Sequence, residues 1–220
     1  LHPPLQFGLQ RNSHLTIARD STKFLIEKGC KIIVVACNTA TTNSIKHLRA
    51  NFNVVQDASR TVIMGISMGG MGSLRMAFKD PTSFLAVAAL EPAIEAAYSY
   101  DTIDAIDRTY RSEALYQSLF GNPVDRDYWQ LNHPPYIARE NMETLKDSGL
   151  NIYIEVGNED RLNLFRGGEM LHRLLFDAGL KHEYLLVHRA DHTGESIPPR
   201  VLNAFDFVGR TLRGSFAIEK

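Results

Sequence analysis

Short apolar runs alternate with segments of helical periodicity along this chain of 220 residues. Five of these runs consist mainly of β-branched or small apolar residues and have the length of buried strands. Strands that are apolar on both faces belong to parallel sheets covered by helices on both sides. The pattern therefore predicts an α/β fold, with a mostly parallel sheet of about five or six strands and helices on both faces. The strands are expected near residues 32–36, 61–65, 84–90, 152–156 and 183–187.

Between these runs, apolar residues recur at intervals of three and four, which predicts helices. Glycine and proline mark several of the expected helix ends. Gly29 and Gly179 suit helix C-termini, and the pair Pro198–Pro199 suits the start of a helix. The helices are expected over Asn12–Lys28, Ala40–Asn51, a segment through Met76 and Phe78, Ile137–Ser148, Arg166–Ala178 and about Val201–Leu212.

One stretch, residues 94–131, interrupts this alternation. It is rich in Tyr, Asp and Arg, and it holds the single tryptophan of the chain, Trp129. Excursions between strands often form a cap over a pocket, so we expect a helical cap here. The equally weighted alternative is a helical insertion without contact to a substrate. We expect residues 1–220 to form a single α/β domain.

Composition and charge exclude several classes of protein. Hydrophobic residues make up 44% of the chain and charged residues 22%, as in an ordinary soluble globular protein. A net charge of −1 argues against a nucleic-acid partner. The longest apolar run, Phe84–Leu90, is far shorter than the roughly 20 residues of a membrane span, so we expect no membrane partner.

The start of the chain and its cysteines bear on the compartment. No basic segment followed by an apolar one opens the chain, so we expect no signal peptide. Cys30 and Cys37 are the only cysteines, and their number and spacing fit neither a disulfide framework nor a zinc motif. These features favour a reducing cytoplasm. The sequence leaves the oligomeric state open.

The strongest chemical signal is Gly65-Ile66-Ser67-Met68-Gly69, which follows a predicted strand and opens a predicted helix. A sharp strand-to-helix turn of this kind is a nucleophile elbow, which strains the serine backbone and projects its oxygen above the sheet edge. Small residues are needed two positions on either side of Ser67. The N–H of Met68, at the helix N-terminus, is expected to receive an oxyanion. The alternative is a glycine-rich turn required only for close helix packing.

A serine alcohol needs a base, and the base needs an acid that orients it. In hydrolases of this architecture the chain order is serine, acid, histidine. The acid should follow a late strand, where Asp160 is our choice and Glu159 its competitor. The histidine should follow the last strand, where His192 lies in a polar turn. The histidines expected to be structural or solvated are His172, His182 and His188.

Residues from about 60 to 212 resemble the α/β-hydrolase superfamily, in particular esterases like esterase D, in four sequence stretches. The resemblance implies a triad of Ser67, Asp160 and His192 that acts on a small-molecule ester. We expect no metal and no other cofactor. The stretches that carry the resemblance are Val62–Gly72, Ala88–Pro92, Glu155–Asp160 and Ala190–His192.

The segment Lys23–Thr41 resembles glutamate racemase instead. This resemblance implies an acid/base thiol at Cys37 and amino-acid binding by Asn38 and Thr39. Racemisation needs a base on each face of the substrate carbon, but Cys30 precedes the same strand and should lie at its opposite end. The opening Asp-Ser-Gly segment of the racemase and its second cysteine motif are absent. We therefore expect Cys37 to be a buried thiol.

The chain is thus predicted to be a chimera of a racemase-like segment, 1–55, and a hydrolase-like segment, 60–220. The expected function is that of a serine hydrolase that cleaves carboxylic esters through a Ser-His-Asp triad and an acyl-enzyme. Hydrolases of this kind have a loop that supplies a second oxyanion N–H, and this loop has no visible counterpart here. The alternatives are therefore a catalytically weak or inactive chimeric scaffold and, last, a remnant of an amino-acid racemase.

Overall fold

The computed structural model describes residues 58–108 and 110–214, together with a few single residues before them. The chain divides into two compact units, Leu1–Gln56 and Asp57–Lys220. In the first unit, the expected strand at 32–36 and both cysteines lie outside the described residues. The described residues of this unit are all helical and fall within the expected helices: Thr16, Arg19, Asp20, Lys23, Phe24, Glu27 and Asn51.

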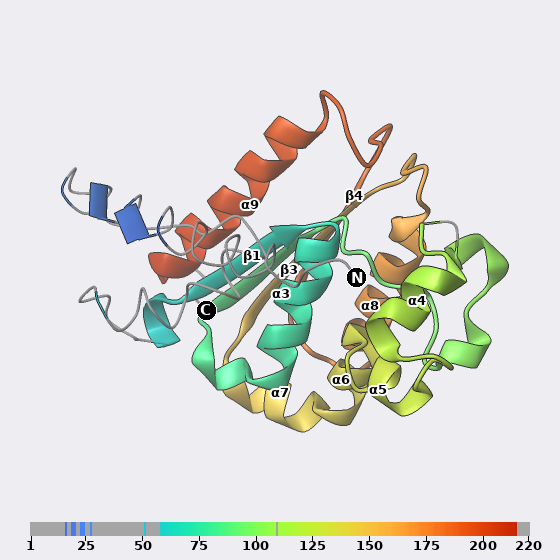
Figure 1. Cartoon of the computed structure of the whole chain (residues 1–220). Coiled ribbons are helices and arrows are strands. Elements are labelled where there is room, and N and C mark those ends of the chain that lie inside the picture. Colours follow the sequence, from blue (N-terminus) through green and yellow to red (C-terminus); the bar gives the residue numbers. More distant parts are fainter. Residues whose placement is uncertain are drawn as a thin grey trace. The chain divides into compact units, whose positions relative to one another are not determined.

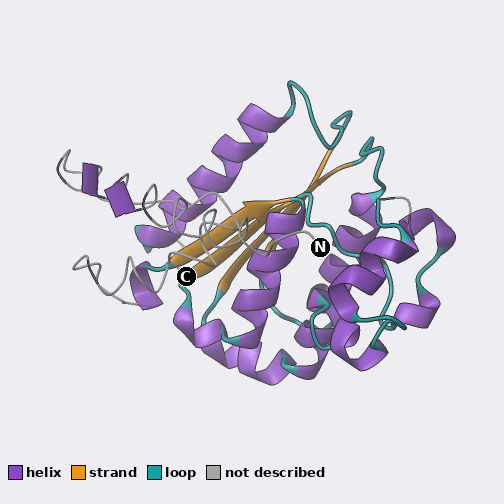
Figure 2. Cartoon of the chain, in the orientation of Figure 1, coloured by secondary structure: helices purple, strands orange, loops and turns teal. Residues whose placement is uncertain are grey.

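The second unit is built on a four-stranded sheet in the order β1-β2-β3-β4 (Figure 2). All three strand pairs are parallel, as the apolar runs predict. The two central strands, β2 and β3, are almost entirely buried, whereas β1 and β4 at the edges of this sheet are half-buried or exposed. The carboxyl ends of the four strands therefore meet at one edge of the sheet. The strands are β1 (Val62–Ile66), β2 (Ala86–Leu90), β3 (Asn151–Gly157) and β4 (Glu183–Val187).

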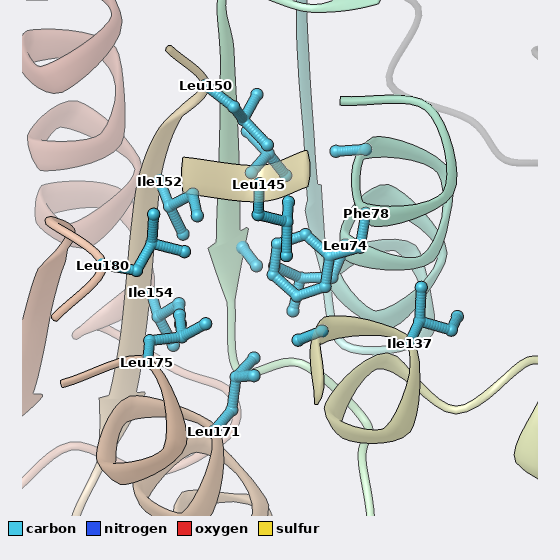
Figure 3. Packing of buried hydrophobic residues seen from close by; sticks show 14 of the residues in the cluster. Leu74, Phe78, Ile137, Leu145, Leu150, Ile152, Ile154, Leu171, Leu175 and Leu180 are labelled. Atoms are coloured by element: carbon cyan, nitrogen blue, oxygen red, sulfur yellow. The ribbon is translucent and has the colours of Figure 1, made fainter. Parts of the chain in front are cut away.

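Helices cover both faces of this sheet. The larger apolar cluster joins one face to α3 (Met68–Lys79), α6 (Pro134–Glu140), α7 (Met142–Ser148) and α8 (Leu164–Asp177). Figure 3 shows this cluster, with Leu74 and Phe78 of α3 facing the strands. The other face packs against α9 (Ile197–Leu212), on the opposite side of the sheet from α3 (Figure 1).

Two helices differ most from their expected bounds. The helix expected over 137–148 is two helices, α6 and α7, which meet at Asn141. The Asn141 side chain donates to the carbonyl of Phe78 at 3.0 Å, so the break lets this polar residue bond to the neighbouring helix. The last helix begins at Ile197 rather than at about 201, because Pro198 and Pro199 form its first turn, where a missing N–H has no cost.

The segment 94–131 forms short helices with a small core of their own. Two aromatic rings, Tyr100 and Trp129, pack edge-on within this core, their ring centres 6.0 Å apart. No helix in the described part of the chain is long and apolar enough to cross a membrane. The remaining short helices are η1 (Ala58–Arg60), η2 (Pro81–Ser83), η3 (Tyr100–Thr102), η4 (Ala105–Arg108), α4 (Glu113–Phe120) and α5 (Arg126–Gln130).

Candidate active site

Ser67 occupies the sharp turn between β1 and α3. Its backbone angles, φ 58° and ψ −121°, lie in a region that residues other than glycine rarely adopt. The surrounding backbone holds it there: the Ser67 N–H donates to the Leu90 carbonyl at 2.9 Å, and the Ser67 carbonyl accepts from Ala93 N–H at 3.0 Å. A strained serine held at the carboxyl edge of a parallel sheet is the geometry of a nucleophile elbow.

The glycines around this turn are needed for space, with one difference from expectation. A Cβ on Gly65 would lie 2.4 Å from the backbone of Gly69, so only glycine fits before the serine. A Cβ on Gly69 would meet nothing within 4 Å. The crowded position after the serine is Gly70, where a Cβ would lie 3.0 Å from the Leu90 carbonyl oxygen, because this side of α3 faces β2.

Met68 is the first residue of α3. Its N–H has no carbonyl four residues earlier within the helix, and the helix dipole places partial positive charge at this end. The N–H therefore lies next to Ser67 in an environment that favours an anion, although its role as an oxyanion donor stays a prediction.

Asp160 and His192 meet at the same edge of the sheet. Asp160 follows β3, His192 follows β4, and His192 Nδ1 lies 3.2 Å from Asp160 Oδ2. Asp160 is buried, and its other carboxylate oxygen accepts from Leu162 N–H at 2.7 Å. Glu159, the competitor for this role, is exposed. The structure therefore pairs His192 with Asp160, and a proton on Nδ1 leaves Nε2 free as the basic nitrogen.

The two groups shift each other's ionisation. The hydrogen bond to Asp160 raises the pKa of His192 above its ordinary value, and burial opposes this only in part. Burial alone would raise the pKa of Asp160, but the hydrogen bonds from His192 and from Leu162 N–H outweigh it and lower that pKa. Asp160 thus stays a carboxylate that stabilises a protonated imidazole.

A hollow of about 450 Å³ opens beside this pair. His192 lines it together with Ile66, which immediately precedes Ser67. Ile197 and Pro198, at the start of α9, form another part of its apolar wall. The end of β1 and the histidine loop therefore border one space that a small organic molecule could enter.

The other histidines are engaged elsewhere. His188 Nδ1 lies 3.2 Å from Asn158 Nδ2, and His172 Nδ1 lies 2.8 Å from His182 Nε2. None of these three forms a hydrogen bond with a carboxylate in the described part of the chain, as His192 does. His172 and His182 are half-buried and bond to each other, so they are not solvated as expected.

Sequence reasoning missed a buried ionic network behind the pair. Arg200 of α9 donates from Nε to Glu155 Oε1 at 2.5 Å and from Nη2 to Glu91 Oε1. All three side chains are almost completely buried. Glu91 directly follows the apolar strand β2, and Glu155 lies within the mostly apolar strand β3. These polar interruptions are the signal that could have identified the two acids.

One group of metal-ligand side chains occurs among residues 58–108 and 110–214. Glu91, Asp160 and His192 each have a ligand atom within 4.8 Å of the others. The guanidinium of Arg200 already places positive charge on Glu91, and His192 already bonds Asp160 through Nδ1. We therefore interpret this group as part of a hydrogen-bonded network and assign no metal to it.

Comparison with known proteins relates the chain to esterases. A family model described as "Putative esterase" matches residues 42–192. A ferulic acid esterase is 19% identical with a TM-score of 0.56, over 76% of this chain and 58% of that chain. The fluorophosphonate-binding serine hydrolase FphF of Staphylococcus aureus is 15% identical with a TM-score of 0.57, over 76% of this chain and 60% of that chain.

The match to racemases is short. Glutamate racemase of Campylobacter concisus (strain 13826) is 52% identical over 44 residues, which is 20% of this chain and 17% of the racemase. This local match supports the prediction of a chimeric chain.

The likeness to the two solved structures establishes the fold, and the chain spans about three fifths of their length. The family match begins at residue 42, earlier than the resemblance seen in the sequence.

Proposed function

This chain belongs to the family described as "Putative esterase", and on that premise we propose that it is a serine hydrolase that cleaves carboxylic esters. The observation that carries the proposal is the 3.2 Å contact between His192 Nδ1 and Asp160 Oδ2, at the sheet edge where the strained Ser67 also lies. The substrate class is a small-molecule ester, since the adjoining hollow of about 450 Å³ suits a small molecule. The proposed location is the reducing cytoplasm, because the number and spacing of the two cysteines do not fit a disulfide framework.

The proposed reaction has two halves. Ser67 Oγ attacks the ester carbonyl carbon while His192 Nε2 takes the serine proton, and the carbonyl oxygen becomes an oxyanion that the Met68 N–H receives. The tetrahedral intermediate collapses, and His192 gives the proton to the leaving alcohol. Water then attacks the acyl-enzyme with His192 again as base, which releases the acid and restores Ser67. Asp160 holds Nδ1 protonated and stabilises the imidazolium throughout.

The second candidate is a scaffold with the triad but little turnover. It is favoured by the single oxyanion donor, Met68 N–H, that can be assigned within the described part of the chain. Loss of one such donor lowers turnover by about 10²–10³-fold. Under this alternative the nucleophile is still activated, but the transition state is poorly stabilised.

Labelling with a fluorophosphonate, followed by peptide mass spectrometry, tests the proposal. The label should map to Ser67, be absent in Ser67→Ala and fall sharply in His192→Ala. His188→Ala is the matched control, because His188 follows the same strand but bonds to Asn158 rather than to Asp160. Folded protein that leaves Ser67 unlabelled would refute the triad. Rapid labelling with very slow hydrolysis of an activated acetate ester would favour the scaffold instead.

A further inference from the structure

Glu91 lies directly behind the proposed triad. It follows β2, its side chain is completely buried, and its backbone has φ 43°, a conformation rare for a residue with a side chain. Its Oε1 accepts from Gly157 N–H at 2.8 Å and from Arg200. Its backbone N–H donates to the Glu155 carbonyl at 2.7 Å. The Glu91 carboxyl is thus held on one side by β3 and α9.

The Glu91 carboxyl also lies close to Asp160. Glu91 Oε2 is buried and has no hydrogen-bond donor among the described residues. A carboxylate oxygen of Glu91 lies within 4.8 Å of ligand atoms of both Asp160 and His192. Two carboxylates can only accept hydrogen bonds, so they cannot bond to each other unless one carries a proton. A proton on Glu91 Oε2 would satisfy the unpartnered oxygen and turn the repulsion into a hydrogen bond.

The charge balance around Glu91 also favours a proton on its carboxyl group. If all carboxyls were ionised, three buried negative charges would face one guanidinium and a neutral imidazole. Such an excess of buried negative charge is unfavourable, and the usual relief is protonation of one carboxyl. Asp160 is held ionised by His192. Both oxygens of Glu155 accept hydrogen bonds, Oε1 from Arg200 and Oε2 from the Tyr153 hydroxyl. Glu91, whose Oε2 has no donor among the described residues, is therefore the site of the proton. The ionisable groups that face or act on Glu91 are Glu155, Asp160, Tyr184, His192 and Arg200.

We propose that Glu91 carries a proton in the active protein and is a positioning residue, whose Oε2–H donates to Asp160 and thereby directs the Asp160 carboxylate at His192 Nδ1. This inference rests on the proposed triad. Burial, opposed by Arg200, raises the pKa of Glu91 to about 7, which is compatible with a proton there near neutrality. Above that pH, Glu91 becomes a second carboxylate beside Asp160, and the hydrogen bond that positions Asp160 is lost.

Glu91→Gln separates this role from a merely structural one. The glutamine amide keeps an oxygen for Gly157 and Arg200, donates from Nε2 toward Asp160, and cannot ionise. The wild type should lose turnover at least about tenfold between neutral pH and about pH 9, as misplacement of a catalytic group predicts. The variant should keep the neutral kcat within about twofold and show no alkaline loss. An alkaline loss of the same size in Glu91→Gln would overturn the proposal.

Infrared spectroscopy gives a readout that does not depend on turnover. The wild type should show the carbonyl stretch of a neutral carboxyl group at about pH 6, and the band should vanish near pH 9. Glu91→Gln should lack the band. Asp107→Asn is the control, because Asp107 is another buried carboxyl whose pKa burial raises. A spectrum without a neutral carboxyl assignable to Glu91 would overturn the proposal. Failure of the proposed function would be seen in the fluorophosphonate experiment, as folded protein in which Ser67 is unlabelled. The infrared band would still decide whether Glu91 carries the proton.

Discussion

A Cβ built on Gly157, at the end of β3, would lie 2.2 Å from the carbonyl oxygen of Ala190, in the loop after β4. The same carbonyl accepts from Glu159 N–H at 3.0 Å. A second link joins these loops, since Arg161 Nη1 donates to Asp191 Oδ2 at 2.9 Å. The loop that carries Asp160 therefore packs directly against the loop that carries His192, and backbone contact sets the distance between the two loops.

Gly157→Ala should damage the site through this contact. The added methyl group has no space, so the two loops must separate and lengthen the bond between Asp160 and His192. We expect a loss of about 1–3 kcal/mol in the free energy of unfolding. Turnover should fall about 10²-fold, because small displacements of catalytic groups are costly.

Gly72→Ala is the matched control for this variant. A Cβ at Gly72 meets nothing within 4 Å, and the residue lies inside α3. Alanine there should stabilise the protein by about 0.5–1 kcal/mol and leave turnover unchanged. Urea unfolding and ester hydrolysis measured on both variants check the pair. Equal behaviour of the two would show that the contact between the loops does not set the geometry of the site.

The pH dependence of hydrolysis should follow His192. The imidazole acts as a base only when neutral, and its hydrogen bond to Asp160 raises its pKa above the ordinary value. Activity should therefore fall as the pH drops through that raised pKa. Asp160→Asn removes the negative charge, so the acidic limb of kcat/KM should move to lower pH while the maximal rate falls by about 10⁴-fold. An acidic limb that stays in place would show that Asp160 does not act on His192.

The sequence carries enough information to place all four described strands. The strands of this parallel sheet contain few polar positions, so their ends appear as changes in hydropathy. The position of Ser67, Asp160 and His192 at one edge of the sheet is also predictable, because each follows a strand and parallel strands bring their carboxyl ends to one edge. The proximity of Asp160 and His192 is thus a consequence of topology, although the two lie 32 positions apart.

The ionic network behind these residues is not predictable in the same way. Glu91 and Arg200 are 109 positions apart, and Arg200 lies within the amphipathic pattern of α9, where an arginine usually marks the solvated face. No periodicity indicates which polar residue of a helix turns inward to meet a buried acid. The break at Asn141 is similar, because its cause is a bond to Phe78 on another helix.

Chelation should not affect hydrolysis. Glu91, Asp160 and His192 resemble a metal-binding group, but Glu91 already accepts from Arg200 and Asp160 already bonds to His192. EDTA should therefore leave both the rate of ester hydrolysis and the thermal midpoint of unfolding unchanged. Loss of activity on dialysis against EDTA, with recovery on addition of Zn²⁺, would contradict this assignment.

Acid should unfold the protein partly through Glu95. This buried side chain accepts from Arg111 Nη1 at 2.6 Å and from the Tyr116 hydroxyl at 2.7 Å. Burial alone would raise the pKa of Glu95, but His133 and Arg111 outweigh it and lower that pKa to about 2. The unfolded chain binds the proton near the ordinary pKa of about 4.5. The stabilisation is therefore complete above that pH and is lost as the pH falls to about 2.

Glu95→Gln tests this contribution. It leaves the Arg111 guanidinium buried without a charged partner, which should cost about 3–5 kcal/mol at neutral pH. The difference between wild type and variant should shrink as the pH falls from about 4.5, because the wild type then loses the same charge. Asp101→Asn is the control: its bond to Arg126 is exposed and should contribute at most about 1 kcal/mol. Urea unfolding across this pH range measures both, and a pH-independent difference for Glu95→Gln would contradict the assignment of a charged Glu95.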